Sequence, residues 1–436
     1  MIQLIDLRNR TIASHEFAAI VPRSLSDVSS AMAVATELIS DVRARGEVAL
    51  LEQAERLDGV RAARIRVGPD EITAAASALD PAVRAALEEA TVRVTAASKA
   101  QVPPPSVTEL APGALVTQRW QPVKRVGLYV PGGKAVYPSS VVMNVVPAQI
   151  AGVTSVALAS PAQKAFGGSV HPTILGAAGL LGITEVYAMG GAGAIGAFAY
   201  GVPELGLDPV QVITGPGNVY VAAAKRLVRG TTGIDSEAGP TEILIIADAH
   251  ANPSFVAADL ISQAEHDELA AAVLVTDSAQ LAETVRHEIE ALAQSAHHGA
   301  RVREALEGVQ SAIVIVDTIE VAAEFSNAYG PEHLEIQTIN PRATLELIDS
   351  AGAIFLGAHS PVSLGDYLAG SNHVLPTGGQ ARFSAGLGTY TFLRPQQVID
   401  YDREALAEVR DRIVALSAAE DLPAHGAAVT ARFLSD

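Results

Sequence analysis

The chain has 436 residues, of which 49% are hydrophobic and 18% are charged. This length and composition are typical of a folded protein of two or three domains and exclude a disordered one. The formal net charge of −18 argues against a nucleic acid or an anionic membrane surface as a partner. No cysteine is present, so any zinc must be held by nitrogen and oxygen ligands, and no thiolate can act as a nucleophile.

The first hundred residues are predicted to be helical. Asp80 is a typical N-cap and Pro81 a typical first helical residue, so a helix is predicted to begin here. The three prolines at 103–105 end this helix. Residues 114–120 alternate in polarity and predict a hairpin. The first ten residues mix acidic and basic side chains and do not resemble a signal peptide, so we expect a cytoplasmic protein.

The middle of the chain is almost free of charge, with four charged side chains in the ninety residues from Ala135 to Ala224. A membrane span needs about 20 apolar residues, but the uncharged stretch 186–203 is interrupted by a Gly-Gly pair and by Pro203. Short strands that alternate with helices of small residues are therefore the favoured interpretation.

Eight short apolar segments predict strands in two groups of four. The segments are Val126–Val130, Ser155–Ala159, Glu185–Met189, Gln211–Thr214, Glu242–Ala247, Ala271–Thr276, Ser311–Val316 and Ala353–Leu356. Uniformly apolar strands separated by helix-length segments indicate parallel sheets that are covered on both faces. The sequence therefore predicts an α/β fold with two similar parallel-sheet, incomplete Rossmann-like domains, a helical N-terminal segment and a small C-terminal tail domain.

Gly191–Gly196 matches the dinucleotide-binding pattern G-x-G-x-x-G and follows a predicted strand. The full fingerprint also needs an acidic residue about 20 positions later, at the end of the next strand. That strand ends in Gly215-Pro216-Gly217-Asn218 and carries no acid there. A closely packed glycine-rich helix is therefore favoured, and nucleotide binding in the standard Rossmann mode stays open as the alternative.

Three polar groups stand out in the second half of the chain. Gln263 and His266 are three residues apart on the predicted helix 253–268, so both could reach one metal ion. Glu332-His333 follows Gly-Pro and is expected in a loop, where it could carry out two proton transfers or form a solvated bend. Asp366 is the only charged residue of the long predicted loop 360–380, which is more often functional than idle. Taken singly, each group is more typical of ordinary surface structure.

Taken together, these motifs are more specific. They occur in the order Gly127–Gly133, Thr214–Asn218, Ala238–Glu242, Gln263–Asp267, Gly330–Glu335 and Leu364–Thr377. Six ordered motifs over nearly 250 residues make a chance match very improbable. From about Asp6 to its C-terminus, the chain resembles the histidinol dehydrogenase family.

The resemblance implies the last two steps of histidine biosynthesis. L-histidinol is oxidised through L-histidinal to L-histidine with two NAD and one zinc ion per site, in a homodimer whose tails cross to the partner subunit. The implied zinc ligands are Gln263, His266, Asp366 and His425, and the implied catalytic pair is Glu332 and His333. The implied substrate contacts are Thr241, Gln263, His266, His333, Asp366, His373, Glu420 and His425, and the implied cofactor contacts are Tyr129 and Asn218.

Two positions depart from the family pattern. Gly193 stands where family members often carry a cofactor-contacting glutamine, which puts one NAD contact in doubt. Thr241 stands where serine is common and keeps the hydroxyl. On this basis the chain divides into an N-terminal arm (1–25), a metal and substrate domain (26–125 with 240–385), a cofactor domain (126–239) and a tail domain exchanged with the partner (386–436).

The chemistry is coherent without the family. Oxygen and nitrogen ligands suit a zinc site that also accepts a substrate imidazole and amine. A neutral His333 can take the alcohol proton, and Glu332 can activate the water that the aldehyde needs. The alternatives are a metal-independent Rossmann oxidoreductase that uses 191–196, a zinc hydrolase, and a non-catalytic protein that binds imidazoles.

Overall fold

A computed structural model describes residues 2–23, 28–132, 135–237 and 239–434. Gly133 and Ala238, which belong to two of the motifs above, lie outside these residues. The chain forms two units, Met1–Gln101 with Lys124–Phe392, and Val102–Val123 with Leu393–Asp436. Each unit is described by itself.

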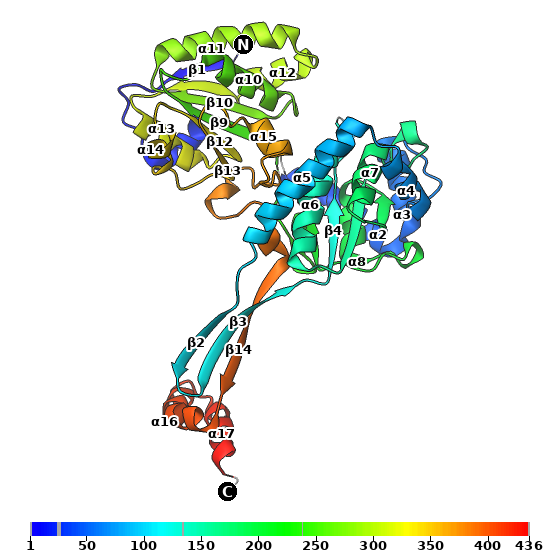
Figure 1. The fold of residues 1–436 in the computed structure, drawn as a ribbon, viewed down its shortest axis with the longest axis vertical. Helices are drawn as coiled ribbons and strands as arrows, with labels where there is room; N and C mark the ends of the chain where they lie inside the picture. The colour runs from blue at the N-terminus through cyan, green and yellow to red at the C-terminus, as the bar shows by residue number, and fades with distance from the viewer. Residues whose placement is uncertain (1, 24–27, 133–134, 238, 435–436) are drawn as a thin grey trace. The chain divides into compact units, whose positions relative to one another are not determined.

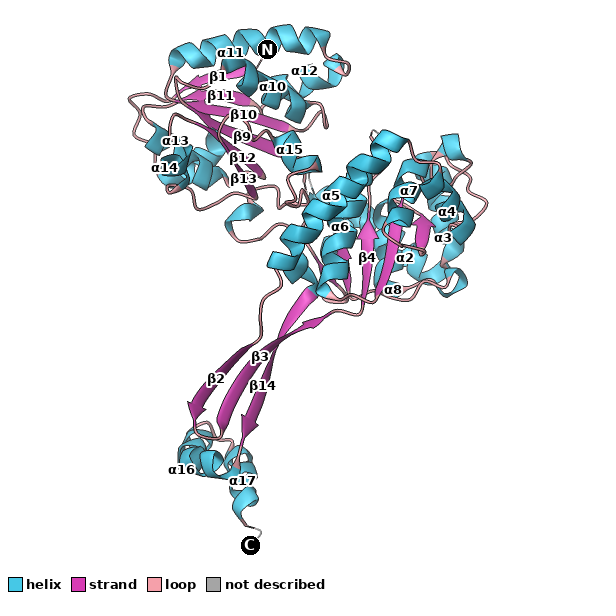
Figure 2. Cartoon of the chain, viewed as in Figure 1, coloured by secondary structure: helices cyan, strands magenta, loops and turns pink. Residues whose placement is uncertain are grey.

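The first unit contains a six-stranded parallel sheet in the order β1-β11-β10-β9-β12-β13 (Figure 2). Its strands are β1 (Gln3–Asp6), β9 (Glu242–Ala247), β10 (Ala271–Thr276), β11 (Ala312–Ile315), β12 (His333–Gln337) and β13 (Ala353–Leu356). Alternate residues of β9 belong to two separate apolar clusters, one on each face of the sheet. Burial on both faces explains why these strands are apolar throughout.

Helices cover both faces of this sheet. One cluster joins the sheet to α10 (Pro253–Ala264), α11 (Ala279–Ser295) and α12 (Gly299–Glu307). The other joins it to α1 (Phe17–Ile20) and α13 (Ile319–Tyr329), and α14 (Pro341–Leu345) also contacts α13. The short helix α15 (Val362–Tyr367) lies within the segment predicted as a long loop.

The same unit contains a second parallel sheet of five strands in the order β6-β5-β4-β7-β8. Its strands are β4 (Arg125–Tyr129), β5 (Ser155–Ser160), β6 (Val186–Ala188), β7 (Val212–Thr214) and β8 (Gly233–Ile234). The chain runs outward from β4 to β6 on one side and then returns to place β7 and β8 on the other. The order therefore reverses between β4 and β7, where α/β sheets commonly bind ligands.

Helices α2 to α9 accompany the second sheet (Figure 1). They are α2 (Val28–Arg45), α3 (Glu47–Gln53), α4 (Pro69–Ser77), α5 (Pro81–Ala100), α6 (Pro138–Ala151), α7 (Pro172–Leu180), α8 (Gly191–Tyr200) and α9 (Val219–Val228). Single helical turns occur at η1 (Ser14–Glu16), η2 (Ala54–Asp58), η3 (Lys164–Phe166), η4 (Pro203–Leu205), η5 (Gln380–Arg382) and η6 (Thr389–Phe392).

The second unit is an antiparallel sheet, β14-β3-β2, followed by two helices. Its elements are β2 (Ser106–Ala111), β3 (Ala114–Pro122), β14 (Leu393–Tyr401), α16 (Arg403–Ala419), α17 (Pro423–Thr430) and the single turn η7 (Ala431–Phe433). The hairpin predicted around residues 114–120 is present, but these residues form only one of its strands: β3 pairs with β2, which precedes it. Asp402 caps α16 by accepting a hydrogen bond from the backbone of Ala405.

The predicted fold class is confirmed, and all eight predicted strands are present. Three predictions about elements are wrong. The N-terminal segment also contributes the edge strand β1, His333 begins a strand instead of lying in a loop, and helix 253–268 ends at Ala264. That helix stops early because the chain turns at Asp267, whose side chain accepts a hydrogen bond from the backbone of Leu269.

One part of the predicted domain division also differs from the packing. Helices α2 to α5, expected with the first sheet, contact α6 to α9 of the second sheet, and α2 packs its apolar side against α8 and α9. The spacing of Ala31, Ala35, Leu38 and Val42 marks the buried side of the helix, but it does not say which sheet buries it. The rest of the division stays a prediction. Within the described ranges, no helix is both long and apolar enough to cross a membrane.

Candidate active site and cofactor pocket

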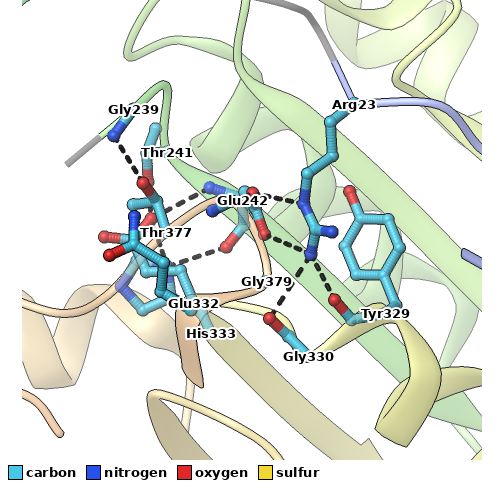
Figure 3. A network of polar contacts seen from close by, with 12 residues as sticks. Arg23, Gly239, Thr241, Glu242, Tyr329, Gly330, Glu332, His333, Thr377 and Gly379 are labelled. Atoms are coloured by element: carbon cyan, nitrogen blue, oxygen red, sulfur yellow. Dashed lines mark hydrogen bonds and ion pairs between the residues drawn. The ribbon is translucent and has the colours of Figure 1, made fainter. Parts of the chain in front are cut away.

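The predicted catalytic pair lies at the amino ends of two neighbouring strands of the first sheet (Figure 3). His333 is the first residue of β12 and pairs in register with Ile243 of β9. Thr241 immediately precedes β9, so the parallel pairing of the two strands brings it beside Glu332. The site is thus at the opposite ends of the strands from those that usually bind ligands in α/β proteins.

Glu332 is buried and its carboxylate is held by two donors. Its Oε2 atom accepts a hydrogen bond of 2.6 Å from Thr241 Oγ1 and one of 2.9 Å from the backbone N–H of Glu242. Burial raises the pKa of Glu332 well above its ordinary value, while these two hydrogen bonds act in the opposite direction. The carboxyl group is therefore a stronger base, once ionised, than an exposed glutamate.

His333 is oriented by the same residue of β9. Its Nδ1 atom lies 3.0 Å from the carbonyl oxygen of Glu242 and 3.6 Å from Glu332 Oε2. Since a carbonyl oxygen only accepts hydrogen bonds, we assign the proton to Nδ1, which leaves the lone pair on Nε2. Burial lowers the pKa of His333, which favours the neutral ring that a general base requires.

Two of the predicted zinc ligands flank the end of α10. Gln263 is buried in its last turn and donates from Nε2 to Thr241 Oγ1 at 2.8 Å, which directs the amide oxygen elsewhere. His266 lies in the following turn, and its backbone N–H donates to the carbonyl of Gln263. Burial lowers the pKa of His266, while the nearby charge of Asp366 raises it. An amide oxygen, a neutral imidazole and a carboxylate are donors that suit zinc.

His373 lies between the segment after α15 and α6 of the second sheet. Its Nδ1 donates to the backbone carbonyl of Asp366 at 2.9 Å, so Nε2 is left to accept from Ser140 Oγ, also at 2.9 Å. Burial lowers its pKa, and the charges of Asp366, His333 and His266 act on it as well. The structure thus brings these imidazoles and Asp366 into one electrostatic neighbourhood.

The two remaining predicted residues belong to the second unit. Glu420 follows α16 and His425 lies in α17, and both side chains are exposed. Among the described residues, no group of three or more histidine, aspartate or glutamate side chains could hold a metal. The first unit contributes only His266 and Asp366 of these types to the predicted set. The meeting of all four ligands stays a prediction.

The predicted cofactor contacts line a cavity at the carboxyl edge of the second sheet. Tyr129 ends β4, and Asn218 caps α9 directly after β7, on the two sides of the position where the strand order reverses. Both line a cavity of about 580 Å³, within the size range of small-molecule sites. Burial raises the pKa of Tyr129 to about 12, and its hydroxyl accepts a hydrogen bond from the backbone of Gly191 at 3.1 Å.

The glycine-rich motif borders the same cavity, although not in the standard Rossmann position. Gly191 and Gly193 open α8 and line the cavity, but α8 follows β6, the edge strand of the sheet. In the dinucleotide fingerprint the glycines follow the first, central strand, which here is β4. This arrangement disfavours the standard Rossmann mode.

Three residues at these sites were not predicted from the sequence to belong to them. Arg23 and Glu242 form an ion pair beside the predicted catalytic pair (Figure 3), and Gln53 of α3 lines the cavity. A charged residue at the start of an otherwise apolar strand is a signal that could have found Glu242. Nothing in the local sequence marks Arg23 or Gln53.

A cavity at the reversal point of one parallel sheet and a buried acid–imidazole pair on another are typical of a two-sheet α/β enzyme that acts on a small molecule. The family model for histidinol dehydrogenase matches residues 21–433. The histidinol dehydrogenases of Leifsonia xyli subsp. xyli and Thermobifida fusca are 69% and 57% identical over 431 and 432 residues. These matches cover 99% of this chain and 99% and 98% of the relatives.

A solved structure agrees with the sequence matches. The crystal structure of histidinol dehydrogenase from Elizabethkingia anophelis matches with a TM-score of 0.93 at 32% identity, over 100% of this chain and 98% of that one. The chain belongs to the histidinol dehydrogenase family. It is an NAD-dependent oxidoreductase of histidine biosynthesis.

Proposed function

We propose that this enzyme oxidises L-histidinol to L-histidine in two successive NAD-linked steps at one zinc-containing site. The observation that carries the proposal is that Glu332 and His333 both form hydrogen bonds with the backbone of one residue of β9, Glu242. Two buried bases, held side by side with different proton affinities, suit two different proton removals.

In the first step His333 accepts the proton of the alcohol. Its Nε2 carries the lone pair, because Nδ1 donates to the carbonyl of Glu242. Hydride leaves for NAD from the carbon that carries the hydroxyl, so the loss of one proton from oxygen and one hydride from carbon gives the aldehyde. The neutral ring favoured by burial is the form that can act near pH 7.

In the second step water supplies the second oxygen atom. Glu332 accepts a proton from the water that attacks the aldehyde, and Thr241 and the backbone of Glu242 hold the carboxylate in place for it. As the hydrate forms, His333 returns the proton of the first step to the aldehyde oxygen. The neutral His333 then takes a proton from the hydrate as the second hydride leaves for a second NAD. No enzyme thiolate takes part, in agreement with the absence of cysteine.

Four residues would hold the zinc ion: Gln263, His266, Asp366 and His425. Gln263 fits this role because its amide nitrogen is committed to Thr241, which leaves the oxygen as the free donor. When bound there, zinc orients the substrate and polarises its reacting oxygen. Thr241, His333, His373 and Glu420 would contact the substrate around it.

The cofactor and the assembly follow from the same proposal. Tyr129 and Asn218 would contact NAD in the cavity of the second sheet. The exposed side chains of Glu420 and His425 support a homodimer in which each tail completes the partner's site. The expected binding partners are the small-molecule substrate and a second copy of the chain, and neither a nucleic acid nor a membrane is expected to bind. The expected compartment is the cytoplasm.

An assay of the purified enzyme with L-histidinol and NAD, before and after chelation and after return of zinc, tests the proposal. We expect two NADH per histidine, loss of activity on chelation and recovery with zinc. Full activity after verified metal removal would support the metal-independent Rossmann oxidoreductase. Absence of NADH formation would favour a zinc hydrolase or an imidazole-binding protein.

A further inference from the structure

Both proposed bases are anchored to the peptide groups of one residue. The N–H of Glu242 donates to Glu332 Oε2 at 2.9 Å, and its carbonyl accepts from His333 Nδ1 at 3.0 Å. Glu242 opens β9, one residue before the pairing of Ile243 with His333. Its peptide groups therefore bind side chains where the neighbouring strand has not yet begun.

The side chain of Glu242 is itself fixed by a buried ion pair. Arg23 Nε lies 2.7 Å from Oε1 and Arg23 Nη2 lies 3.2 Å from Oε2, and the backbone of Gly378 donates to Oε1 at 2.7 Å. The two side chains are 20% and 4% exposed. A two-point contact of this kind fixes orientation as well as charge.

Arg23 also holds the segment that leads into the catalytic pair. Its Nη2 donates to the backbone carbonyls of Tyr329 and Gly330, and its guanidinium lies 3.9 Å from the centre of the Tyr329 ring. One side chain thus connects the first residue of β9 with the turn that precedes Glu332 (Figure 3).

We propose that Arg23 and Glu242 are positioning residues that set the orientation of both Glu332 and His333, through the Glu242 peptide and the 329–331 turn. This inference rests on the proposed catalytic roles of Glu332 and His333. A guanidinium is required at position 23, because an ammonium cannot form the two-point contact and reach both carbonyl groups at once.

The test compares Arg23→Ala, Arg23→Lys and Glu242→Gln with a matched control, Arg125→Ala. Arg125 forms a comparably buried ion pair with Glu185 in the second sheet, where the side chains are 15% and 19% exposed, and it has no contact with the proposed bases. We expect the Arg23 and Glu242 variants to lower kcat by about 10- to 100-fold, as displaced supporting groups commonly do. The KM for NAD of the Arg23 and Glu242 variants should remain close to wild type. The activity of Arg125→Ala should also remain close to wild type.

Chemical rescue separates positioning from general support of the fold. Guanidinium ion at low millimolar concentration should restore part of kcat to Arg23→Ala and none to Arg125→Ala. In side-chain ¹⁵N spectra, Arg23→Ala should lose the single Nδ1–H tautomer of His333. Normal kcat in folded Arg23→Lys and Arg23→Ala, or losses that guanidinium leaves unchanged while the His333 spectrum stays wild type, would overturn the inference.

One further variant keeps the two proposals distinguishable. His333→Asn should remove alcohol oxidation if His333 is the base. An active His333→Asn enzyme would refute the proposed function itself. An inactive one, with unaltered Arg23 and Glu242 variants, would refute only the positioning role.

Discussion

Glu332 and His333 are adjacent in sequence, and burial moves their pKa values in opposite directions. It raises that of Glu332 and lowers that of His333, because a low-dielectric surrounding disfavours the charged form of each. The raised pKa of Glu332 lies closer to neutral pH, where a general base is most effective. The lowered pKa of His333 keeps its ring in the neutral form that can accept a proton. This tuning depends on the fold, and no local sequence signal predicts it.

Substitution should separate the two half-reactions. We expect Glu332→Gln to oxidise histidinol at a near-normal rate and to slow histidinal oxidation by about 10²- to 10⁴-fold, the usual contribution of a general base. His333→Asn should slow both steps. Stopped-flow NADH formation from each substrate measures this, and equal losses in both steps for Glu332→Gln would contradict the division of roles.

Gly193 departs from the family pattern, which often has glutamine at this position, and the packing around it supplies a structural reason. A Cβ atom at this position would lie 2.3 Å from Gln53 Oε1 and 3.2 Å from Leu50 Cδ2. The Gln53 amide is buried and donates to the carbonyl of Leu38 at 3.1 Å. Gln53 thus fills the space beside Gly193, where the resemblance predicts a glutamine side chain.

We expect Gly193→Ala to destabilise the protein although it improves helix propensity. Overpacking costs about 1–3 kcal/mol, and the gain over glycine in a helix is about 1 kcal/mol, so a net loss of about 1 kcal/mol is expected. The double variant Gln53→Ala/Gly193→Ala should be more stable than the sum of the single changes predicts. Urea unfolding measures this cycle, and strict additivity would show that Gln53 does not restrict position 193.

At the scale of elements, β12 was missed for a physical reason. Leu334 and Ile336 alternate with His333, Glu335 and Gln337, a pattern typical of a strand with one solvated face. Here the polar side chains are buried as well. His333 belongs to the candidate site, and Glu335 and Gln337 form hydrogen bonds with residues of α15 and α10. The apolar strands were predictable, since burial on both faces leaves a continuous apolar segment. The alternation in β12 is short and directly follows Gly330-Pro331, which favoured a loop.

The polar side of β12 ties together the two elements that carry the proposed ligands of the first unit. Glu335 accepts from the backbone of Val362, which begins α15, and from Gln337 Nε2, both at 2.9 Å. Gln337 Nε2 also lies 3.2 Å from Asp259 of α10, one turn before Gln263. Burial raises the pKa of both Glu335 and Asp259.

This cluster should give a defined pH dependence of stability. A pKa that is raised in the folded state means that unfolding releases a proton above the ordinary glutamate pKa of about 4.3, so the stability due to Glu335 falls as the pH rises. We therefore expect Glu335→Gln to gain stability relative to wild type between pH 5 and pH 8, by at most about 1.4 kcal/mol per pH unit.

Urea unfolding of Glu335→Gln and of the wild type, at pH 5 and at pH 8, measures this difference in the free energy of unfolding. Glu304→Gln, an exposed change on α12, is the control and should show no such trend. A difference between Glu335→Gln and wild type that stays constant with pH would contradict the buried protonated carboxyl group.

Across the whole molecule, the first unit could be predicted in part from local sequence patterns, whereas the predicted site residues of the second unit could not. The parallel sheets were predictable from apolar segments and from the Gly and Pro residues that separate them. Gln263, His266, Glu332, His333 and Asp366 stand out as polar groups in the sequence, but their roles come from the family resemblance. Glu420 and His425 carry no local signal, and only the family resemblance assigns them a role. The packing of α2 was not predictable, because an apolar stripe does not identify its partner.

Mixed dimers test the proposed exchange of tails. His266→Ala and His425→Ala homodimers should each be inactive and deficient in zinc. If each tail completes the partner's site, a heterodimer of the two variants contains one intact ligand set and should recover up to about half of the wild-type activity per dimer. Verified heterodimers without activity would contradict a shared site.

The central claim is that Gln263, His266, Asp366 and His425 meet at one zinc ion beside Glu332 and His333. Anomalous diffraction at the zinc edge from crystals grown with histidinol measures this most directly. We expect one peak per chain within bonding distance, roughly 2.0–2.2 Å, of the four side chains, with His425 supplied by the partner subunit. A zinc peak coordinated by other residues, or well-ordered active crystals without a peak at this position, would contradict it.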